Sequence, residues 1–148
     1  MLFRSVHQHI GSGWLGMREP MLALDLILEI AEQVDTLEFV DIGGGLGVPY
    51  KPGEERLDVQ TLGREINQRM QEFSKKYGRE IILRFEPGRY VVAEAGVLLA
   101  EVNTVKQTII RRVVVGTNTG MNHLVRPAMY GSYHEIVNVS NQIGRAHV

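Results

Sequence analysis

The apolar positions in the first half of the chain predict strands and helices in alternation. Residues 2–7 form a short strand candidate. Residues 20–34 have the spacing of an amphipathic helix, whose apolar positions are Leu24, Ile27, Leu28, Ala31 and Val34. Residues 37–42 are an apolar run that is too short for a helix and is followed by glycines, which indicates a buried strand.

A second helix is predicted to begin after Asp58, because aspartate is a favoured N-cap residue, and to end at Gly78. The apolar face of this helix is expected to contain Val59, Leu62, Ile66, Met70, Phe73 and Tyr77. Residues 80–85 are predicted to form a third strand. Strands that alternate with helices in this way are typical of parallel sheets with right-handed crossovers, so we expect an α/β fold.

The pattern changes after residue 96. Residues 97–107, 109–115 and 124–139 are β-type runs without a helical period, which is typical of an antiparallel β region. We therefore expect a partial α/β domain over residues 1–96 and the start of a β domain over 97–142. An eight-stranded α/β barrel takes about 250 residues, so the three predicted strand–helix units are expected to be one part of an incomplete barrel.

Composition and charge exclude several classes of function. The chain has 148 residues, and its net charge of −1 provides no basic surface for nucleic acid or an anionic membrane. No stretch approaches the roughly 20 apolar residues that span a bilayer. Because there is no cysteine, disulfides and thiolate metal sites are excluded, and a cytoplasmic location is expected.

Each predicted parallel strand ends in a polar or glycine-rich turn, and ligands bind at this edge of α/β sheets. The second turn, residues 43–47, can bring backbone N–H groups close to an anion. The dinucleotide-binding fingerprint does not fit, because Val48 replaces its last glycine and Pro49 and Pro52 prevent the helix that should follow. A merely flexible exit from the strand is the alternative.

The third turn contains Glu86 and, three residues later, Arg89. A guanidinium can bind a phosphate through two hydrogen bonds. A carboxylate can keep a heterocyclic nitrogen protonated, which a pyridine ring needs in order to accept electrons. The alternative is an exposed ion pair between these two residues.

The first turn contains His7 and His9, followed by Ser12. An H-x-H pair at the end of a barrel strand can bind a metal. The other histidines lack companion carboxylates in a metal-binding pattern, so no metal site is predicted. Stacking on a planar ligand requires only His9.

Three motifs in register resemble one known cofactor site. HIGSG at 9–13, DIGGGLG at 41–47 and EPGR at 86–89 are similar to the site of the fold-type III, alanine-racemase-like decarboxylases that use pyridoxal 5'-phosphate (PLP). The resemblance implies the C-terminal part of a PLP-binding (β/α)8 barrel, followed by a β domain, in an enzyme that works as a homodimer.

The resemblance also implies a role for each residue of the three turns. His9 is expected to stack on the pyridine ring, and Ser12 to help hold the phosphate. Glu86 is expected to pair with the ring nitrogen, and Arg89 to lie at the phosphate and near the substrate. The phosphate-binding amides are those of Gly43, Gly44 and Gly45.

A fourth motif narrows the family. Residues 120–130 are similar to the G-M-N-x-L-x-R-P-x-L-Y segment of the diaminopimelate decarboxylase family, in which the arginine and the tyrosine bind a substrate carboxylate. These positions are Arg126 and Tyr130. Alternatively, Arg126 pairs with an acidic neighbour and Tyr130 packs within the β domain.

The implied reaction is loss of carbon dioxide from meso-diaminopimelate to give L-lysine, so the partner is a small amino-acid substrate. Within the family, the alternatives are decarboxylation of carboxynorspermidine, ornithine or arginine. From other classes, the alternatives are a non-catalytic module that binds PLP or phosphate, and a chain without a physiological role.

The lysine that forms a Schiff base with PLP should precede HIGSG by a long stretch of barrel, and none of Lys51, Lys75, Lys76 and Lys106 fits that position. No catalytic residue is therefore predicted in this chain, which is expected to be an internal fragment that is inactive alone. Residues 143–148 match one reading frame of a common sequencing adapter and are expected to be a non-native tail.

Overall fold

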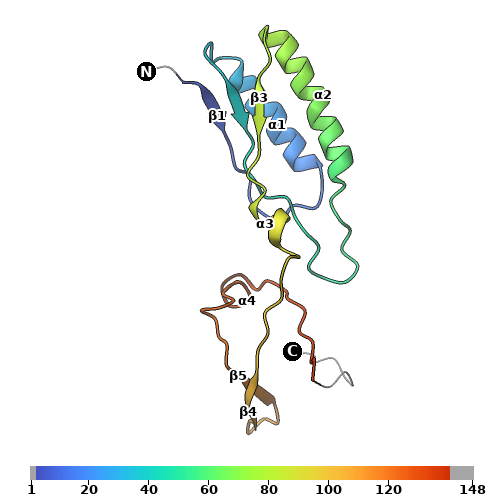
Figure 1. Cartoon of the computed structure of the whole chain (residues 1–148), viewed down its shortest axis with the longest axis vertical. Coiled ribbons are helices and arrows are strands. Elements are labelled where there is room, and N and C mark those ends of the chain that lie inside the picture. Colours follow the sequence, from blue (N-terminus) through green and yellow to red (C-terminus); the bar gives the residue numbers. More distant parts are fainter. Residues whose placement is uncertain (1–2, 141–148) are drawn as a thin grey trace. The chain divides into compact units, whose positions relative to one another are not determined.

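A three-stranded parallel sheet is the centre of the first part of the chain. The computed structural model describes residues 3–140. The strands β1 (Ser5–His7), β2 (Phe39–Asp41) and β3 (Ile82–Arg84) lie in the order β1-β2-β3 (Figure 1). The predicted parallel strands with helical connections are confirmed, and the class is α/β.

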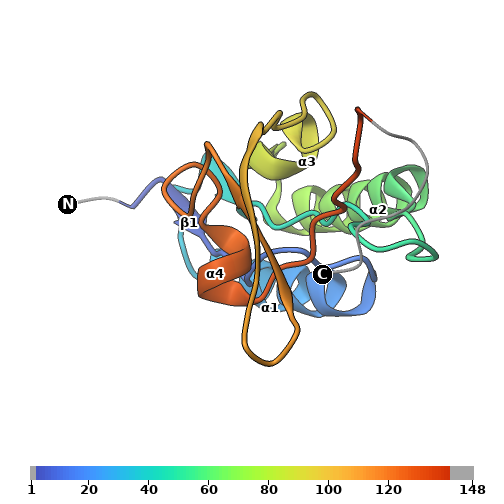
Figure 2. The same ribbon diagram turned by 90° about the horizontal axis from the view of Figure 1, so that it is seen from below.

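Two helices, α1 (Arg18–Ala31) and α2 (Val59–Tyr77), pack side by side on one face of the sheet (Figure 2). Val40 of β2 is fully buried beneath them, whereas its neighbour Asp41 points to the other face and stays partly exposed. Burial of apolar surface drives this packing. The core cluster consists of Met21, Leu24, Ile27, Leu28, Ala31, Leu37, Val40, Ile42, Leu57, Leu62, Ile66, Met70, Phe73 and Ile81.

Both ends of α2 lie where the sequence predicts them. One carboxylate oxygen of Asp58 accepts hydrogen bonds from the amides of Gln60, at 3.1 Å, and Thr61, at 3.0 Å. Gly78 ends the helix in the left-handed conformation with φ of 86°, which glycine adopts without steric cost. The predicted N-cap and stop signal are confirmed.

Replacing Asp58 by alanine is expected to lower the melting temperature of the chain at neutral pH. The hydrogen bond from the Thr61 hydroxyl is the main cause that lowers the pKa of Asp58 below its ordinary value. Because the pKa of the folded form is depressed, the stabilisation is fully present above the ordinary aspartate pKa of about 3.9 and is lost as the pH falls through the folded value.

Thermal melts followed by circular dichroism at pH 7 and pH 2 test this cap. The melting temperatures of wild type and Asp58→Ala should differ at pH 7 and should be nearly equal at pH 2. Asp35→Ala removes another exposed aspartate and serves as the control. An equal difference at both pH values would contradict the role of the Asp58 charge.

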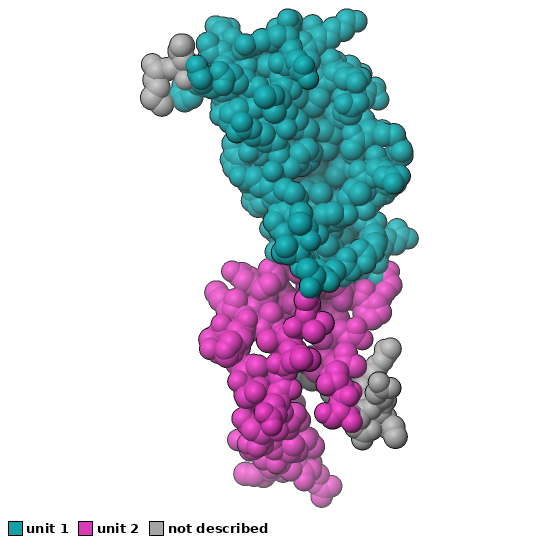
Figure 3. All heavy atoms as spheres, in the orientation of Figure 1, with its two compact units in different colours: residues 1–49, 54–95 teal, residues 50–53, 96–148 magenta. Residues whose placement is uncertain are grey.

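The contacts within the chain define two compact units (Figure 3). Unit 1 contains residues 1–49 and 54–95, and unit 2 contains residues 50–53 and 96–148. In unit 1, the short helix α3 (Gly88–Val92) begins within the third turn and contains Arg89.

Unit 2 contains an antiparallel pair, β4 (Val102–Gln107) and β5 (Val113–Thr117). The predicted antiparallel character is therefore confirmed. The β prediction for residues 124–139 is wrong, because α4 (Arg126–Tyr130) is helical and no described residue after β5 lies in a strand.

The physical reason for this error lies at the two ends of α4. Pro127 has no N–H to donate to a sheet and suits the first turn of a helix. Gly131 ends the helix in the left-handed conformation, with φ of 59°. Local backbone preferences therefore override the β-type composition. The predicted tail, residues 143–148, lies outside the described residues. Among the described residues, no helix has the length and apolarity that crossing a membrane requires.

Candidate functional site

Backbone hydrogen bonds hold the three turns together at the carboxyl edge of the sheet. The amide of Gly13 in the first turn donates to the carbonyl of Gly45 in the second, at 2.8 Å. The amide of Glu86 in the third turn donates to the carbonyl of Gly43, also at 2.8 Å. The second turn is therefore bonded to both of its neighbours, and the predicted motifs converge.

The glycines of the second turn allow this close approach. A Cβ atom on Gly44 would collide with the backbone carbonyl of Glu86, and one on Gly45 would collide with the carbonyl of Gly11. Side chains at these positions would push the turns apart. Glycine is thus required here by backbone packing, and not merely by flexibility.

The amides of the three glycines differ in what they already bind. Gly43 N–H donates to Oδ1 of Asp41 at 2.9 Å, and Gly44 N–H donates to Nδ1 of His9 at 3.3 Å. Within residues 3–140 the amide of Gly45 makes no hydrogen bond. It is a backbone donor that is available to an external anion.

The first turn presents its side chains to solvent. His9 and Ser12 are both exposed. Because Nδ1 of His9 accepts from Gly44, the neutral ring carries its proton on Nε2. The imidazole is thereby attached to the glycine turn, and the Ser12 hydroxyl lies three residues further along the same loop.

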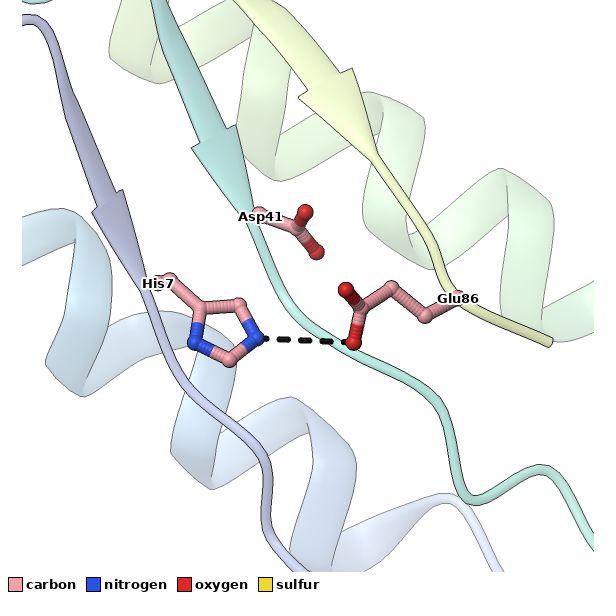
Figure 4. A group of neighbouring side chains, drawn as sticks. All are labelled: His7, Asp41 and Glu86. Carbon is pink, nitrogen blue, oxygen red and sulfur yellow. Dashed lines mark ion pairs between the residues drawn. The ribbon is translucent and has the colours of Figure 1, made fainter. Parts of the chain in front are cut away.

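Glu86 does not pair with Arg89, as the alternative interpretation of the third turn supposed. Its ion-pair partner within the described residues is His7, with 3.5 Å between Nε2 and Oε2 (Figure 4). The guanidinium of Arg89 instead approaches the first turn, since its Nη1 lies 3.5 Å from the position that a Cβ on Gly13 would take. Arg89 is therefore available beside the HIGSG loop.

Sequence reasoning missed that Asp41 joins His7 and Glu86. One ligand atom from each of the three side chains lies within 4.8 Å of the others. One imidazole nitrogen and two carboxylates are groups that also bind divalent metals. His9, which the H-x-H pattern paired with His7, is bonded to Gly44 instead. The available signal was the aspartate at the end of the second strand, two residues before the first glycine.

Arg126 and Tyr130 lie together in unit 2. The Arg126 guanidinium carbon is 5.8 Å from the centre of the Tyr130 ring, and Nη2 donates to the Ser132 hydroxyl at 3.1 Å. Arg126 has no ion pair with any described acidic residue, and its buried Nε has no hydrogen-bond partner among the described residues. The side chain of Tyr130 is exposed. The pair can therefore bind an anion.

The chain matches two domains of one enzyme family. Residues 4–93 match the pyridoxal binding domain of the pyridoxal-dependent decarboxylases, and residues 57–147 match the C-terminal sheet domain of the same enzymes. The chain belongs to the pyridoxal-dependent decarboxylase family. The cofactor implied by this family is PLP.

Individual relatives agree with this assignment. The chain is 43% identical over 138 residues to a diaminopimelate decarboxylase of Methanothermobacter thermautotrophicus, covering 89% of this chain and 32% of the relative. It resembles a crystal structure of a diaminopimelate decarboxylase with a TM-score of 0.82 and 37% identity, covering 90% of this chain and 32% of that one. The Helicobacter pylori enzyme complexed with L-lysine gives a TM-score of 0.79 and 32% identity, covering 93% of this chain and 34% of that one. The chain thus spans about a third of the length of these relatives.

Proposed function

We propose that the whole protein is a PLP-dependent decarboxylase that converts meso-diaminopimelate to L-lysine. One observation carries the proposal: backbone hydrogen bonds join the three turns at one edge of the sheet. A free glycine amide, a histidine ring and the Glu86 carboxylate therefore lie on neighbouring turns. Residues 1–96 form part of the PLP-binding barrel, and residues 97–142 begin the C-terminal β domain. The enzyme works as a homodimer in the cytoplasm.

The residues present fit a phosphorylated pyridine ring. The amide of Gly45 and the hydroxyl of Ser12 would donate hydrogen bonds to the phosphate, and Arg89 would balance its charge from beside the first turn. Gly43 and Gly44 would also line the phosphate subsite, and the Gly44 amide, which donates to His9 here, would be free for the phosphate with His9 stacked on the ring. Glu86 would accept the hydrogen bond of the ring nitrogen.

The chemistry of the bound cofactor is to take up the electron pair that carbon dioxide leaves behind. Glu86 supports this by keeping a proton on the ring nitrogen, because a nearby carboxylate favours the charged form of its partner. His9 fixes the plane in which a ring can lie. The fixed turns supply orientation without reorganisation of the backbone.

Arg126 and Tyr130 select the substrate by binding the carboxylate that is not cleaved. The orphaned Nε of Arg126 supports this role, because a buried donor without a partner is costly and a carboxylate would satisfy it. Ornithine and arginine lack a second carboxylate, which disfavours them as substrates. Carboxynorspermidine has one and remains the alternative within the family.

Binding of PLP to the 148-residue chain is the first test. We expect weak, non-covalent binding, because none of Lys51, Lys75, Lys76 and Lys106 matches the position of the Schiff-base lysine that the family resemblance implies. Lys75 and Lys76 lie in the last turn of α2, and Lys76 is paired with Glu32. Absorbance titration should show saturable binding that inorganic phosphate displaces, with no adduct after borohydride reduction. A covalent adduct at a lysine of this chain would contradict the site.

Activity of the whole protein tests the reaction. Purified enzyme is offered meso-diaminopimelate, carboxynorspermidine, ornithine and arginine separately, and release of carbon dioxide is measured. Production of lysine from meso-diaminopimelate, with little turnover of the other three, is the expected result. Faster turnover of carboxynorspermidine would overturn the assigned substrate but leave the cofactor site intact.

A further inference from the structure

His7 is the side chain that contacts the Glu86 carboxylate, and the strand register explains why. His7 lies opposite Asp41, which in turn lies opposite Arg84, on three neighbouring strands. Side chains alternate between the faces of a sheet, so these positions share the face that the helices leave uncovered. Figure 4 shows the three side chains of His7, Asp41 and Glu86 turned toward one another.

The backbone beneath this group is fixed. The amide after His7, that of Gln8, donates to the carbonyl of Asp41 at 3.0 Å, and the amide of Ile42 donates to the carbonyl of Arg84 at 3.2 Å. With Glu86 bonded to Gly43, the three strand ends cannot shift independently. The relative positions of the side chains therefore depend mainly on their own rotamers.

The neighbouring polar side chains on this face of the sheet already have other partners. The guanidinium of Arg84 lies over the ring of Phe39, 3.7 Å from its centre. Oδ1 of Asp41 accepts from the amide of Gly43. Among the described residues, the only group that forms an ion pair with Glu86 is the imidazole of His7. It reaches Oε2 and leaves Oε1 without a partner in the described part of the chain.

We propose that His7 is a positioning residue: it holds Oε2 of Glu86 so that Oε1 faces the nitrogen of the bound pyridine ring. Asp41 lies within 4.8 Å of both groups and completes the cluster. The inference rests on the proposed function, because the ring nitrogen enters only with PLP. Contact between His7 and Glu86, however, does not require the cofactor.

The first experiment uses the chain without PLP. The ring-nitrogen signals of His7 are recorded by ¹H–¹⁵N NMR in wild type, Glu86→Gln and the exposed-residue control Glu80→Gln. We expect the Nε2 signal to move in Glu86→Gln and to stay in place in the control. If the Nε2 signal of His7 had the same chemical shift in wild type and in Glu86→Gln, the inference would be overturned, whether or not the chain binds PLP.

The second experiment loads the same chain with ¹⁵N-labelled PLP at a pH at which the ring nitrogen of free PLP is unprotonated. It measures the chemical shift of the pyridine nitrogen, which distinguishes the protonated and unprotonated forms. Wild type should show the protonated form, and Glu86→Gln the unprotonated one. The chemical shift of the ring nitrogen in His7→Ala should lie between those of wild type and Glu86→Gln. In His7→Gln, which keeps an N–H donor, the shift should be nearer to that of wild type. His123→Ala, an exposed histidine in unit 2, is the matched control.

The affinity for PLP should change little in His7→Ala, by at most about fivefold, because exposed ion pairs are weak. A ring signal that is identical in wild type and His7→Ala would contradict the positioning role while leaving the cofactor site in place. If bound PLP in wild type gave the signal of free PLP, the proposed pairing of Glu86, and with it the cofactor site, would fail, even where His7 and Glu86 are in contact.

Discussion

Replacing Leu24 by alanine is expected to destabilise the chain by about 2–5 kcal/mol, the usual cost of removing a buried leucine side chain. Leu24 lies on the inner face of α1, and its exposed fraction is 0%. This loss of stability has two parts: the burial of apolar side-chain surface that alanine no longer provides, and the cavity that remains in the core. Native proteins are stable by only about 5–15 kcal/mol, so the substitution is expected to remove a large part of the free energy of unfolding.

The matched control is two residues away on the same helix. Leu22 is 56% exposed, and Leu22→Ala should change the free energy of unfolding by no more than about 0.5 kcal/mol. Urea denaturation followed by circular dichroism compares the two variants. Equal losses in both would show that α1 does not pack as described.

The helices were predictable because their signals are local. The face of α2 follows from apolar spacing within a few turns, and its ends follow from Asp58 and Gly78, each acting on backbone groups within three or four residues. Parallel pairing of the strands also followed, since short strands that alternate with helices allow few other topologies. These features depend on short stretches of chain.

The side-chain partners in the site were not predictable from local patterns. Glu86 and Arg89 are three residues apart and of opposite charge, so a mutual ion pair was a natural alternative. The contact that forms joins His7 to Glu86 across the strand register and involves Asp41 between them. Which side chain meets which depends on the pairing of β1, β2 and β3, and that pairing links residues far apart in sequence.

The hydrogen-bond partners of the amides in the glycine turn were also not fully predictable from the sequence. The motif predicts three equivalent donors, yet Gly43 and Gly44 already donate to Asp41 and His9. The bond from Gly43 to Asp41 is local, whereas the bond from Gly44 to His9 forms only because the first turn lies beside the second. The motif therefore indicates which segment packs between its two neighbours, and three-dimensional packing decides which of its amides lack a hydrogen-bond partner among the described residues.

The glycine turn also gives the second large effect: Gly44→Ala is expected to lower the affinity for PLP by more than tenfold. A Cβ on residue 44 would collide with the backbone carbonyl of Glu86, which cannot move like a flexible side chain. The third turn must shift, and the Glu86 carboxylate shifts with it. Overpacking of this kind also destabilises proteins, typically by about 1–3 kcal/mol.

Gly63→Ala separates this effect from the general consequences of replacing a glycine. Gly63 is exposed within α2, and a Cβ there would meet no atom within 4 Å. Since alanine favours a helix interior over glycine by about 0.5–1 kcal/mol, this control should raise the stability and leave PLP binding unchanged. PLP titrations and thermal melts of both variants give the comparison. If Gly44→Ala bound PLP with the affinity of wild type, contact between the Gly43–Gly45 turn and the Glu86 turn would not be needed for cofactor binding. The hydrogen bonds that join these turns would then have no role in the proposed site.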